Sequence, residues 1–200
     1  MTLSSFTSKI SKAYSYVEYR NLLSSLMEQN KTTGLDQSEA MIEYAKLNIQ
    51  RMNRIDQKIE LDSAFKDALV QLNTPLQWYV ITEGWCGDAA QNVPVFALAE
   101  KISDKINLKL ILRDENSEIM NQYLTNGSKS IPKLICFDSV SGTELFVWGP
   151  RPETCQNIMI QLKKEGKEKN DIAKAIHAWY ATDKTLSLQR ELILLLKNIN

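Results

Sequence analysis

The sequence is poor in the residues that build metal sites and disulfide scaffolds. Its 200 residues include one histidine and three cysteines, Cys86, Cys136 and Cys155. An odd number of cysteines at wide spacing excludes a disulfide framework, and a zinc site would need a closely spaced pair. We therefore expect no bound metal, and no motif indicates another cofactor.

Excess charge and long hydrophobic segments are also missing. The 24 basic residues balance 24 acidic ones, so the zero net charge gives no basic footprint for nucleic acid. The longest uncharged run, residues 68–82, is interrupted by polar residues and is too short to cross a bilayer. Residues 1–20 have no apolar block like that of a secretory signal. These observations predict a cytoplasmic protein that binds neither nucleic acid nor a membrane.

What the sequence does contain indicates a folded chain with a helical beginning. Hydrophobic residues make up 44% and charged residues 24%, as in an ordinary globular domain. Apolar residues at helical spacing predict a helical extension over residues 1–73, and Asp36 with Glu39 is expected to form a capping box. The three helices expected there cover residues 16–27, 36–55 and 62–72.

The middle of the chain, residues 74–168, changes to short runs rich in β-branched and aromatic residues. We expect four strands, at residues 78–82, 108–112, 133–137 and 144–148, with helices at 86–103 and 117–126. The crossover makes the first two strands parallel, and a short turn makes the last two a hairpin. The prediction is an α/β fold with a mixed sheet of four strands flanked by helices. Further helices are expected at residues 152–164, 172–180 and 186–197, and residues 169–200 form a C-terminal helical extension.

Three segments are expected to meet at one edge of this sheet. Residues 83–90 follow the first strand, residues 113–116 follow the second, and residues 130–132 begin the antiparallel third. Ligands of open α/β sheets gather beyond the carboxyl ends of the parallel strands. A thiol, carboxylates, an arginine and a proline therefore converge where a site is expected.

The residues at this edge resemble those of thioredoxin-like proteins. Trp85-Cys86-Gly87 opens a helix that contains Pro94, and Ile131-Pro132 precedes an antiparallel strand. Gly149 after the last strand is a third correspondence. The resemblance covers residues 75–165 and implies that Pro132 is cis and faces Cys86. The run Trp-Cys-Gly-Asp-Ala-Ala is similar to that of a bacterial subgroup with helical segments on both sides.

The departures from this family decide the expected chemistry. Ala89 stands where the resolving cysteine would be, and Val80 replaces the buried acid. Thr82 replaces a tryptophan, and Asp88 replaces the proline between the two cysteines. A dithiol cycle within the motif is therefore impossible. A single cysteine at a helix N-terminus is stabilised as a thiolate by free N–H groups, while Asp88 opposes this charge, so the direction of the shift stays open.

We expect a monothiol thioredoxin-like protein that performs thiol–disulfide exchange, with resolution by an external thiol. Its partner would be a protein or a low-molecular-weight thiol or disulfide. The expected roles are catalysis by Cys86, substrate binding by Trp85, Gly87, Asp88, Ile131 and Pro132, and modulation of the thiolate by Arg113 and Asp114.

Two alternatives use the same fold differently. A binding or adaptor module would pair a peptide with the edge at Pro132 and need no turnover. A cluster-binding monothiol protein would need further thiolates from outside the chain. We interpret Cys136 as a small buried residue, Cys155 as a surface or packing residue, and His177 as an anchor of its helix rather than a catalytic group.

Overall fold

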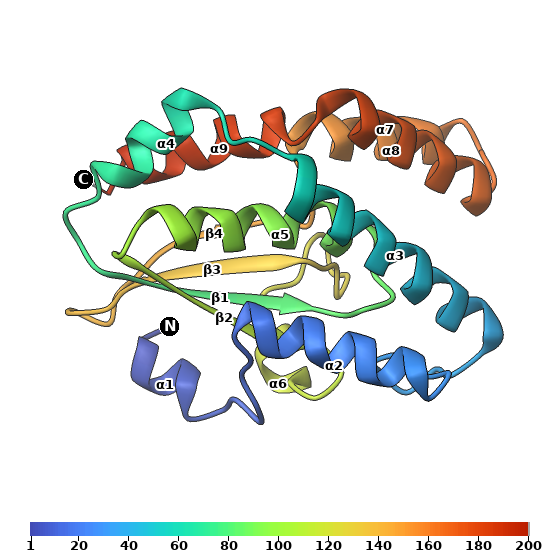
Figure 1. Cartoon of the computed structure of the whole chain (residues 1–200), viewed down its shortest axis with the longest axis horizontal. Helices are drawn as coiled ribbons and strands as arrows, with labels where there is room; N and C mark the ends of the chain where they lie inside the picture. Colours follow the sequence, from blue (N-terminus) through green and yellow to red (C-terminus); the bar gives the residue numbers. More distant parts are fainter. Residues whose placement is uncertain (200) are drawn as a thin grey trace.

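The computed structural model describes residues 1–199 and shows helices packed around one sheet (Figure 1). The strands are β1 (Leu76–Thr82), β2 (Ile106–Leu112), β3 (Lys133–Asp138) and β4 (Glu144–Trp148). Their order in the sheet is β2-β1-β3-β4. β1 pairs with β2 in parallel and with β3 antiparallel, and β3 pairs antiparallel with β4. The α/β class and the mixed four-stranded sheet are confirmed.

Helices precede, connect and follow the strands. Before the sheet come α1 (Leu3–Thr7), α2 (Tyr16–Glu28), α3 (Glu39–Lys58) and α4 (Ser63–Val70). Within it lie α5 (Gly87–Ile102) and α6 (Ser117–Met120). After it come α7 (Glu153–Lys164), α8 (Lys169–Asp183) and α9 (Leu186–Lys197). No helix within residues 1–199 is long and apolar enough to span a membrane.

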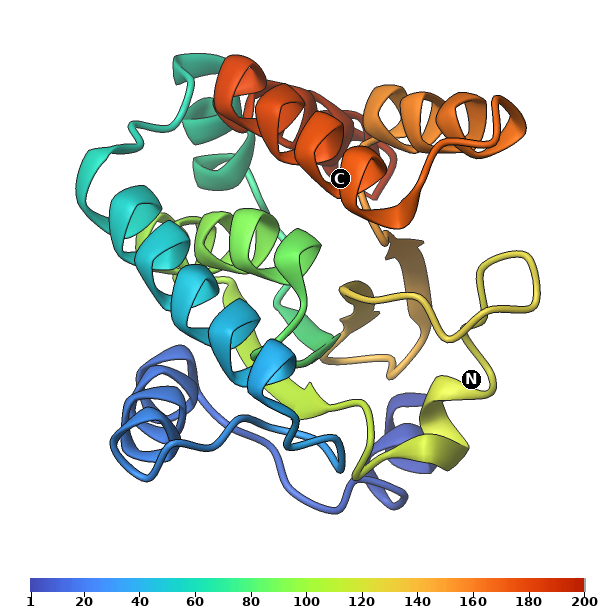
Figure 2. The same ribbon diagram turned by 90° about the vertical axis from the view of Figure 1, so that its right-hand side faces the viewer.

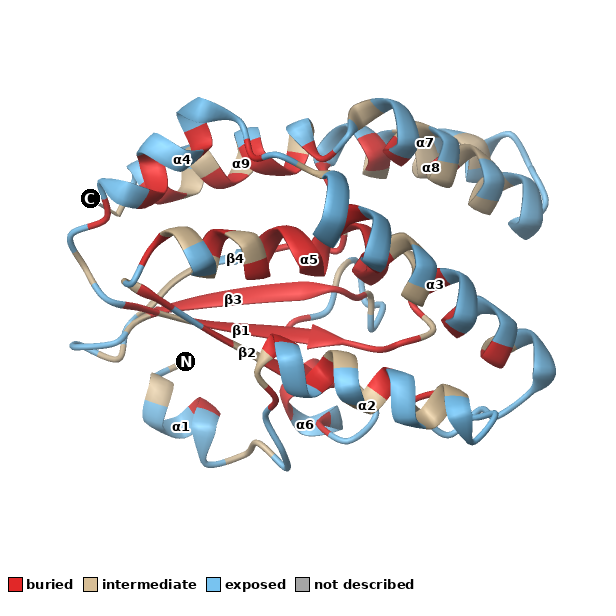
Figure 3. Ribbon diagram, in the orientation of Figure 1, coloured by how far each residue is buried: buried red, intermediate tan, exposed pale blue. Residues whose placement is uncertain are grey.

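Helices cover both faces of the sheet. Side chains along β1 point alternately to the two faces, and nearly all of them are buried. Trp78 faces α5, where its ring lies 6.1 Å from that of Phe96. On the opposite face, Phe6 of α1 packs 4.9 Å from the ring of Tyr79 and 5.1 Å from that of Phe137. Figure 3 shows buried residues along β1 and β3 and over much of α5. The sheet is therefore the centre of the core.

The C-terminal helices pack in two different ways. Leu188, Leu192 and Leu196 of α9 are fully buried in the main core. Cys155 of α7 and Tyr180 of α8 belong to a smaller cluster of their own. Figure 2 shows α3 and α8 on either side of α5, so both extensions frame the helix that follows β1.

Three local expectations were wrong. The helix expected at residues 117–126 ends at Met120 as the short α6, because a loop with a local pairing of Thr125 and Ser128 follows. The capping box at Asp36 does not form, because Ser38 is the N-cap of α3 and Asp36 Oδ1 accepts the Ser38 N–H in a tight turn before it. The short helix α1 was not expected, since its five residues are too few to show a helical period.

Candidate functional site

Cys86 lies where β1 ends and α5 begins. It is the N-cap residue of α5, and its Sγ accepts a hydrogen bond from the Ala89 N–H at 3.4 Å. The thiol donates to the carbonyl oxygen of Ile131 at 3.3 Å. The sulfur is thus held between a helix terminus and the segment that leads into β3. Only 8% of the residue is exposed, so Cys86 has little access to solvent.

This setting keeps the Cys86 thiol protonated. Burial raises its pKa to about 12, and the charge of Asp88 adds to this shift. The N–H groups of Ala89 and Asp88 and the charge of Arg151 act in the opposite direction. Desolvation therefore outweighs the helix terminus, and the direction of the shift that the sequence left open is upward.

The segment opposite the cysteine has the geometry that the resemblance implied. The Ile131-Pro132 peptide bond is cis, and both residues are buried. Gly149, at the end of β4, has φ of +116°, and a Cβ there would lie 2.2 Å from the carbonyl oxygen of Pro132. Only glycine permits this approach of the two backbones.

Asp88 is bound by residues from two distant parts of the chain. Arg151, which follows the cis Gly149-Pro150 bond, donates from Nε to Asp88 Oδ1 at 3.0 Å and from Nη2 to Oδ2. The hydroxyl of Tyr180 on α8 donates to Asp88 Oδ1 at 2.9 Å and accepts from Asn92 Nδ2 at 3.0 Å. This bidentate pair with its added hydrogen bonds fixes the carboxylate beside the thiol.

Arg113 and Asp114 lie together on the other side of Trp85. Arg113 donates to Asp114 at 2.8 Å, and its guanidinium lies 4.6 Å from the centre of the Trp85 ring. The structure therefore brings Trp85, Arg113 and Asp114 together, but the arginine that acts on the thiol is Arg151. Arg151 could not be found from the sequence, because it lies outside the three segments expected at the sheet edge.

His177 approaches the N-terminus of α5 from α8. A Cβ added to Gly87 would lie 2.7 Å from His177 Cε1 and 2.8 Å from Nε2, so glycine is needed for this contact. Burial and the nearby charge of Arg51 lower the pKa of His177 to about 4, which leaves the ring neutral. Its Nδ1 is buried and has no hydrogen-bond partner among residues 1–199. His177 thus packs against the residue that follows Cys86.

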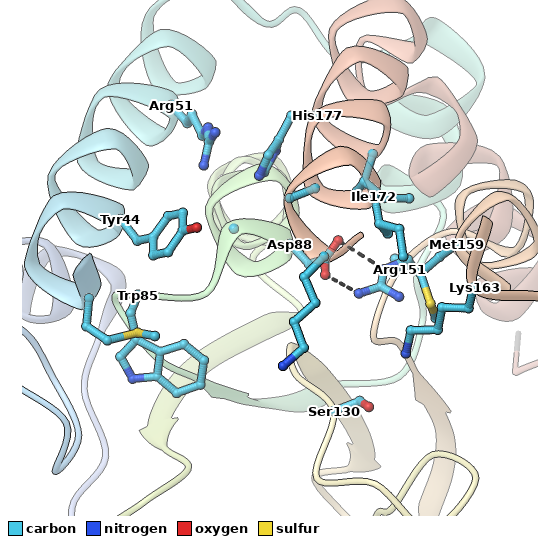
Figure 4. Close-up of a pocket in the computed structure, with 15 residues that line it drawn as sticks. Tyr44, Arg51, Trp85, Asp88, Ser130, Arg151, Met159, Lys163, Ile172 and His177 are labelled. Atoms are coloured by element: carbon cyan, nitrogen blue, oxygen red, sulfur yellow. Dashed lines mark hydrogen bonds and ion pairs between the residues drawn. The ribbon is translucent and has the colours of Figure 1, made fainter. Parts of the chain in front are cut away.

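A cavity of about 410 Å³ opens beside this cluster (Figure 4). Trp85 and Asp88 line its sheet side, next to Ser130. Figure 4 shows Arg51 and Tyr44 on α3 facing His177 across the opening. The remaining wall comes from α7, α8 and Arg151, namely Met159, Lys163, Lys169, Ile172, Ala173 and Ile176. The helical extensions therefore supply most of this cavity.

Glu83 is a buried acid that sequence reasoning missed. It is 1% exposed, and its Oε1 accepts the Asp114 N–H at 2.9 Å. Burial raises its pKa to about 6. Glu83 lies in the segment 83–90 that was expected at the sheet edge. Its burial could not be predicted, because charged residues in loops are usually exposed.

The other two cysteines do not belong to this site, and the described residues contain no group that could hold a metal ion. Cys136 and Cys155 are fully buried, which confirms packing as their place in the structure, and all three cysteines are free thiols. Within residues 1–199, no three His, Cys, Asp or Glu side chains are grouped so that they could hold a metal ion.

A helix that starts with a cysteine after β1, facing a cis-proline before β3, defines a thioredoxin-like protein. A family model described as Thioredoxin matches residues 34–165, which is more than half of the sequence. The chain belongs to this thioredoxin family.

Solved structures share the fold at low sequence identity. A protein of unknown function from Pseudomonas aeruginosa, PA1234, is 16% identical with a TM-score of 0.57, covering 94% of this chain and 99% of that one. An HIV epitope-scaffold is also 16% identical, with a TM-score of 0.56 and coverage of 92% and 99%. No curated protein matches the sequence. At this identity the likeness concerns the fold alone, and it extends over the helical extensions as well.

Proposed function

We propose that this chain is a monothiol thiol–disulfide exchange protein in which Cys86 is the nucleophile. The observation that carries the proposal is the position of Cys86 Sγ, held at the start of α5 by the Ala89 N–H and by the carbonyl oxygen of Ile131. Trp85, Gly87 and Asp88, its neighbours in sequence, line the cavity, so a substrate bound there lies beside the residues that flank the thiol.

The exchange requires one thiolate and one external thiol. Cys86 loses its proton to solvent, and its sulfur attacks a disulfide R–S–S–R′. A new S–S bond forms between Cys86 and the R–S group, while the R–S–S–R′ bond breaks and R′–S⁻ leaves to take up a proton. Cys86 is oxidised to the mixed disulfide and R′ is reduced to a thiol. A low-molecular-weight thiolate, R″–S⁻, then attacks the R sulfur of the mixed disulfide. The new disulfide R–S–S–R″ leaves, and the Cys86 thiolate takes up a proton.

Because the pKa of Cys86 is raised, only a small fraction of the thiol is ionised near neutral pH, and Cys86 reacts slowly as a nucleophile. Ala89 leaves no resolving thiol beside it, so the mixed disulfide persists until an external thiol arrives. These two features suit selective exchange with a bound substrate rather than rapid reduction of many disulfides.

The test is reaction of the reduced protein with bis(2-hydroxyethyl) disulfide, followed by mass spectrometry of the intact chain and its peptides. We expect one adduct, at Cys86, that an added thiol removes, and no adduct in Cys86→Ser. Cys136 and Cys155, both fully buried, are the internal references. Modification of Cys86 no faster than theirs would refute the proposal.

The enclosure of Cys86 favours a second candidate, a binding module in which the thiol only packs. With 8% exposure and a protonated sulfur, Cys86 would serve as an N-cap, and the cavity would be the functional feature. This candidate predicts that Cys86→Ser keeps the phenotype of the wild type, whereas the exchange function predicts its loss.

A further inference from the structure

The lining of the cavity beside Cys86 carries an excess of positive charge, although the net charge of the chain is zero. This lining has four basic side chains, Arg51, Arg151, Lys163 and Lys169, and one carboxylate, Asp88. The bidentate contact with Arg151 already neutralises Asp88. No carboxylate within residues 1–199 forms an ion pair with the other three.

Arg51 is built into the site rather than left on the surface. Its Nη1 donates to Asn48 Oδ1 at 2.7 Å, and Asn48 Nδ2 donates to the carbonyl oxygen of Gly84 at 3.0 Å. Asn48 is 1% exposed, so this link fixes the guanidinium of α3 to the loop that ends at Cys86. Burial and the charge of Arg54 lower the pKa of Arg51, as expected for a desolvated cation without an acid.

The two lysines complete the charged wall. Lys163 lies in the last turn of α7, and Lys169 begins α8. A cation at a helix N-terminus is unfavourable for the helix, so the position of Lys169 is not explained by helix stability. Figure 4 shows Lys163 across the cavity from Arg51 and Tyr44. An anion between these walls would pair with several cations at once.

The rest of the lining sets the size and the character of the ligand. Tyr44, Trp85 and Met159 offer apolar surface between the cations. A volume of about 410 Å³ lies in the range of small-molecule sites, roughly 300–1,000 Å³. Side chains from α3, α7 and α8 line this space, which stays open enough for a small ligand to enter.

We infer that this cavity binds a carboxylate-bearing low-molecular-weight thiol, or one half of its disulfide, with Arg51, Lys163 and Lys169 pairing with the carboxylates. The assignment of the ligand as a thiol rests on the proposed function of Cys86. Bound in this way, the ligand would place its sulfur against Trp85 and Gly87, the two neighbours of the cysteine.

The test uses S-methylglutathione, which has two carboxylates but no sulfur that can exchange. Titration calorimetry with the full chain should show binding, and Arg51→Met and Lys163→Met should each weaken it about tenfold. The matched controls Lys46→Met, on an exposed part of α3, and Lys164→Met, next to Lys163 but outside the cavity lining, should bind like the wild type.

Absence of binding, or equal binding by Arg51→Met, Lys163→Met and the wild type, would overturn the inference. The diethyl ester of the probe, which lacks carboxylates, should bind at least about tenfold more weakly. Equal affinity for the ester would also overturn it.

The Cys86→Ser variant separates this inference from the proposed function. It should bind S-methylglutathione like the wild type, because the probe needs no thiol. Binding by this variant, together with no exchange at Cys86 in the wild type, would refute the exchange function and leave the anion site standing. Exchange with the neutral bis(2-hydroxyethyl) disulfide, without any binding of S-methylglutathione, would do the reverse.

Discussion

Two charges of opposite sign act on the sulfur of Cys86, and substitutions at each should move its reactivity in opposite directions. Asp88 raises the pKa of the thiol and Arg151 lowers it. We expect faster alkylation of Cys86 by iodoacetamide in Asp88→Asn and slower alkylation in Arg151→Met, at any pH below the pKa. Each unit by which the pKa falls increases the thiolate fraction about tenfold. Peptide mass spectrometry over a series of alkaline pH values gives the rates.

The pair of variants contains its own control. Both remove the same buried ion pair, so both should lower the free energy of unfolding. A loss of structure alone would therefore speed alkylation in both variants. Rates that change in the same direction would contradict an electrostatic role for Asp88.

Glu83 should make stability depend on pH in an unusual direction. Its folded pKa is about 6 and its ordinary value is 4.5. A carboxyl group raised in this way contributes stability that is complete below the unfolded pKa and is lost as the pH rises through the folded pKa. The difference corresponds to about 2 kcal/mol. Glu83→Gln should therefore gain about this much relative to the wild type between pH 4 and pH 7.

Urea denaturation of both proteins across this range measures the effect. The comparison must be a difference, because the lowered pKa of His177 contributes with the opposite sign over much of the same range. His177 titrates in both proteins, so its contribution cancels. A difference in stability that stays constant with pH would show that Glu83 does not titrate in this window.

At the scale of elements, the close contact between α5 and α8 depends on Gly87, which has no side chain. A Cβ at position 87 would lie under 3.0 Å from the His177 ring. Gly87→Ala should therefore lower the melting temperature by forcing α8 away from α5. In a His177→Ala background the added methyl group has space, and the same substitution should cost much less.

A double-mutant cycle of the four proteins, followed by thermal denaturation, measures this coupling. Additive effects of the two substitutions would mean that the α5–α8 contact is not limited by these atoms. The reactivity of Cys86 in the same proteins would report whether the position of α8 affects the thiol.

The elements with a strong period could be predicted from the sequence. The apolar spacing from Tyr16 gave α2, and the β-branched runs gave all four strands, with ends that shifted by at most two residues. The pattern failed where local turns compete with helices, as after Met120, or where the helix is too short to repeat, as in α1. The residue at which a helix begins, such as the N-cap Ser38 in place of Asp36, depends on local backbone geometry that the spacing of residues does not contain.

Some residues of the candidate site could also be predicted from the sequence, and others could not. Cys86 and Pro132 could be placed because β1 and β3 bring their ends to one edge, which strand order alone determines. Arg51, Arg151 and His177 could not, because they come from helices whose docking depends on tertiary packing. His177 was interpreted as an anchor, and its contact with Gly87 is such a packing contact, but it also lies on the wall of the cavity.

At the scale of the whole molecule, the helical extensions are parts of the core rather than additions to it. Phe6 and Tyr19 from the N-terminal side and Leu192 from α9 are buried together with the strands in one cluster. Met1 pairs through its amino group with Glu144 of β4, and Gln189 of α9 accepts the Asp62 N–H at 2.7 Å. The N-terminus is therefore tied to the sheet and α9 to the start of α4, while the α7 and α8 walls of the cavity pack in the smaller cluster of Cys155, Ile176 and Tyr180.

This common core should make unfolding a single transition, and α9 provides a test. Leu192 is fully buried, whereas Leu194 on the same helix is 64% exposed. Leu192→Ala should lower the free energy of unfolding by about 2–5 kcal/mol because it leaves a cavity. Leu194→Ala should change it by less than about 0.5 kcal/mol. Far-ultraviolet circular dichroism and tryptophan fluorescence, which reports on the fully buried Trp78 of β1, should give coincident urea transitions for Leu192→Ala. An earlier transition of the helical signal would instead show that α9 unfolds separately from the sheet.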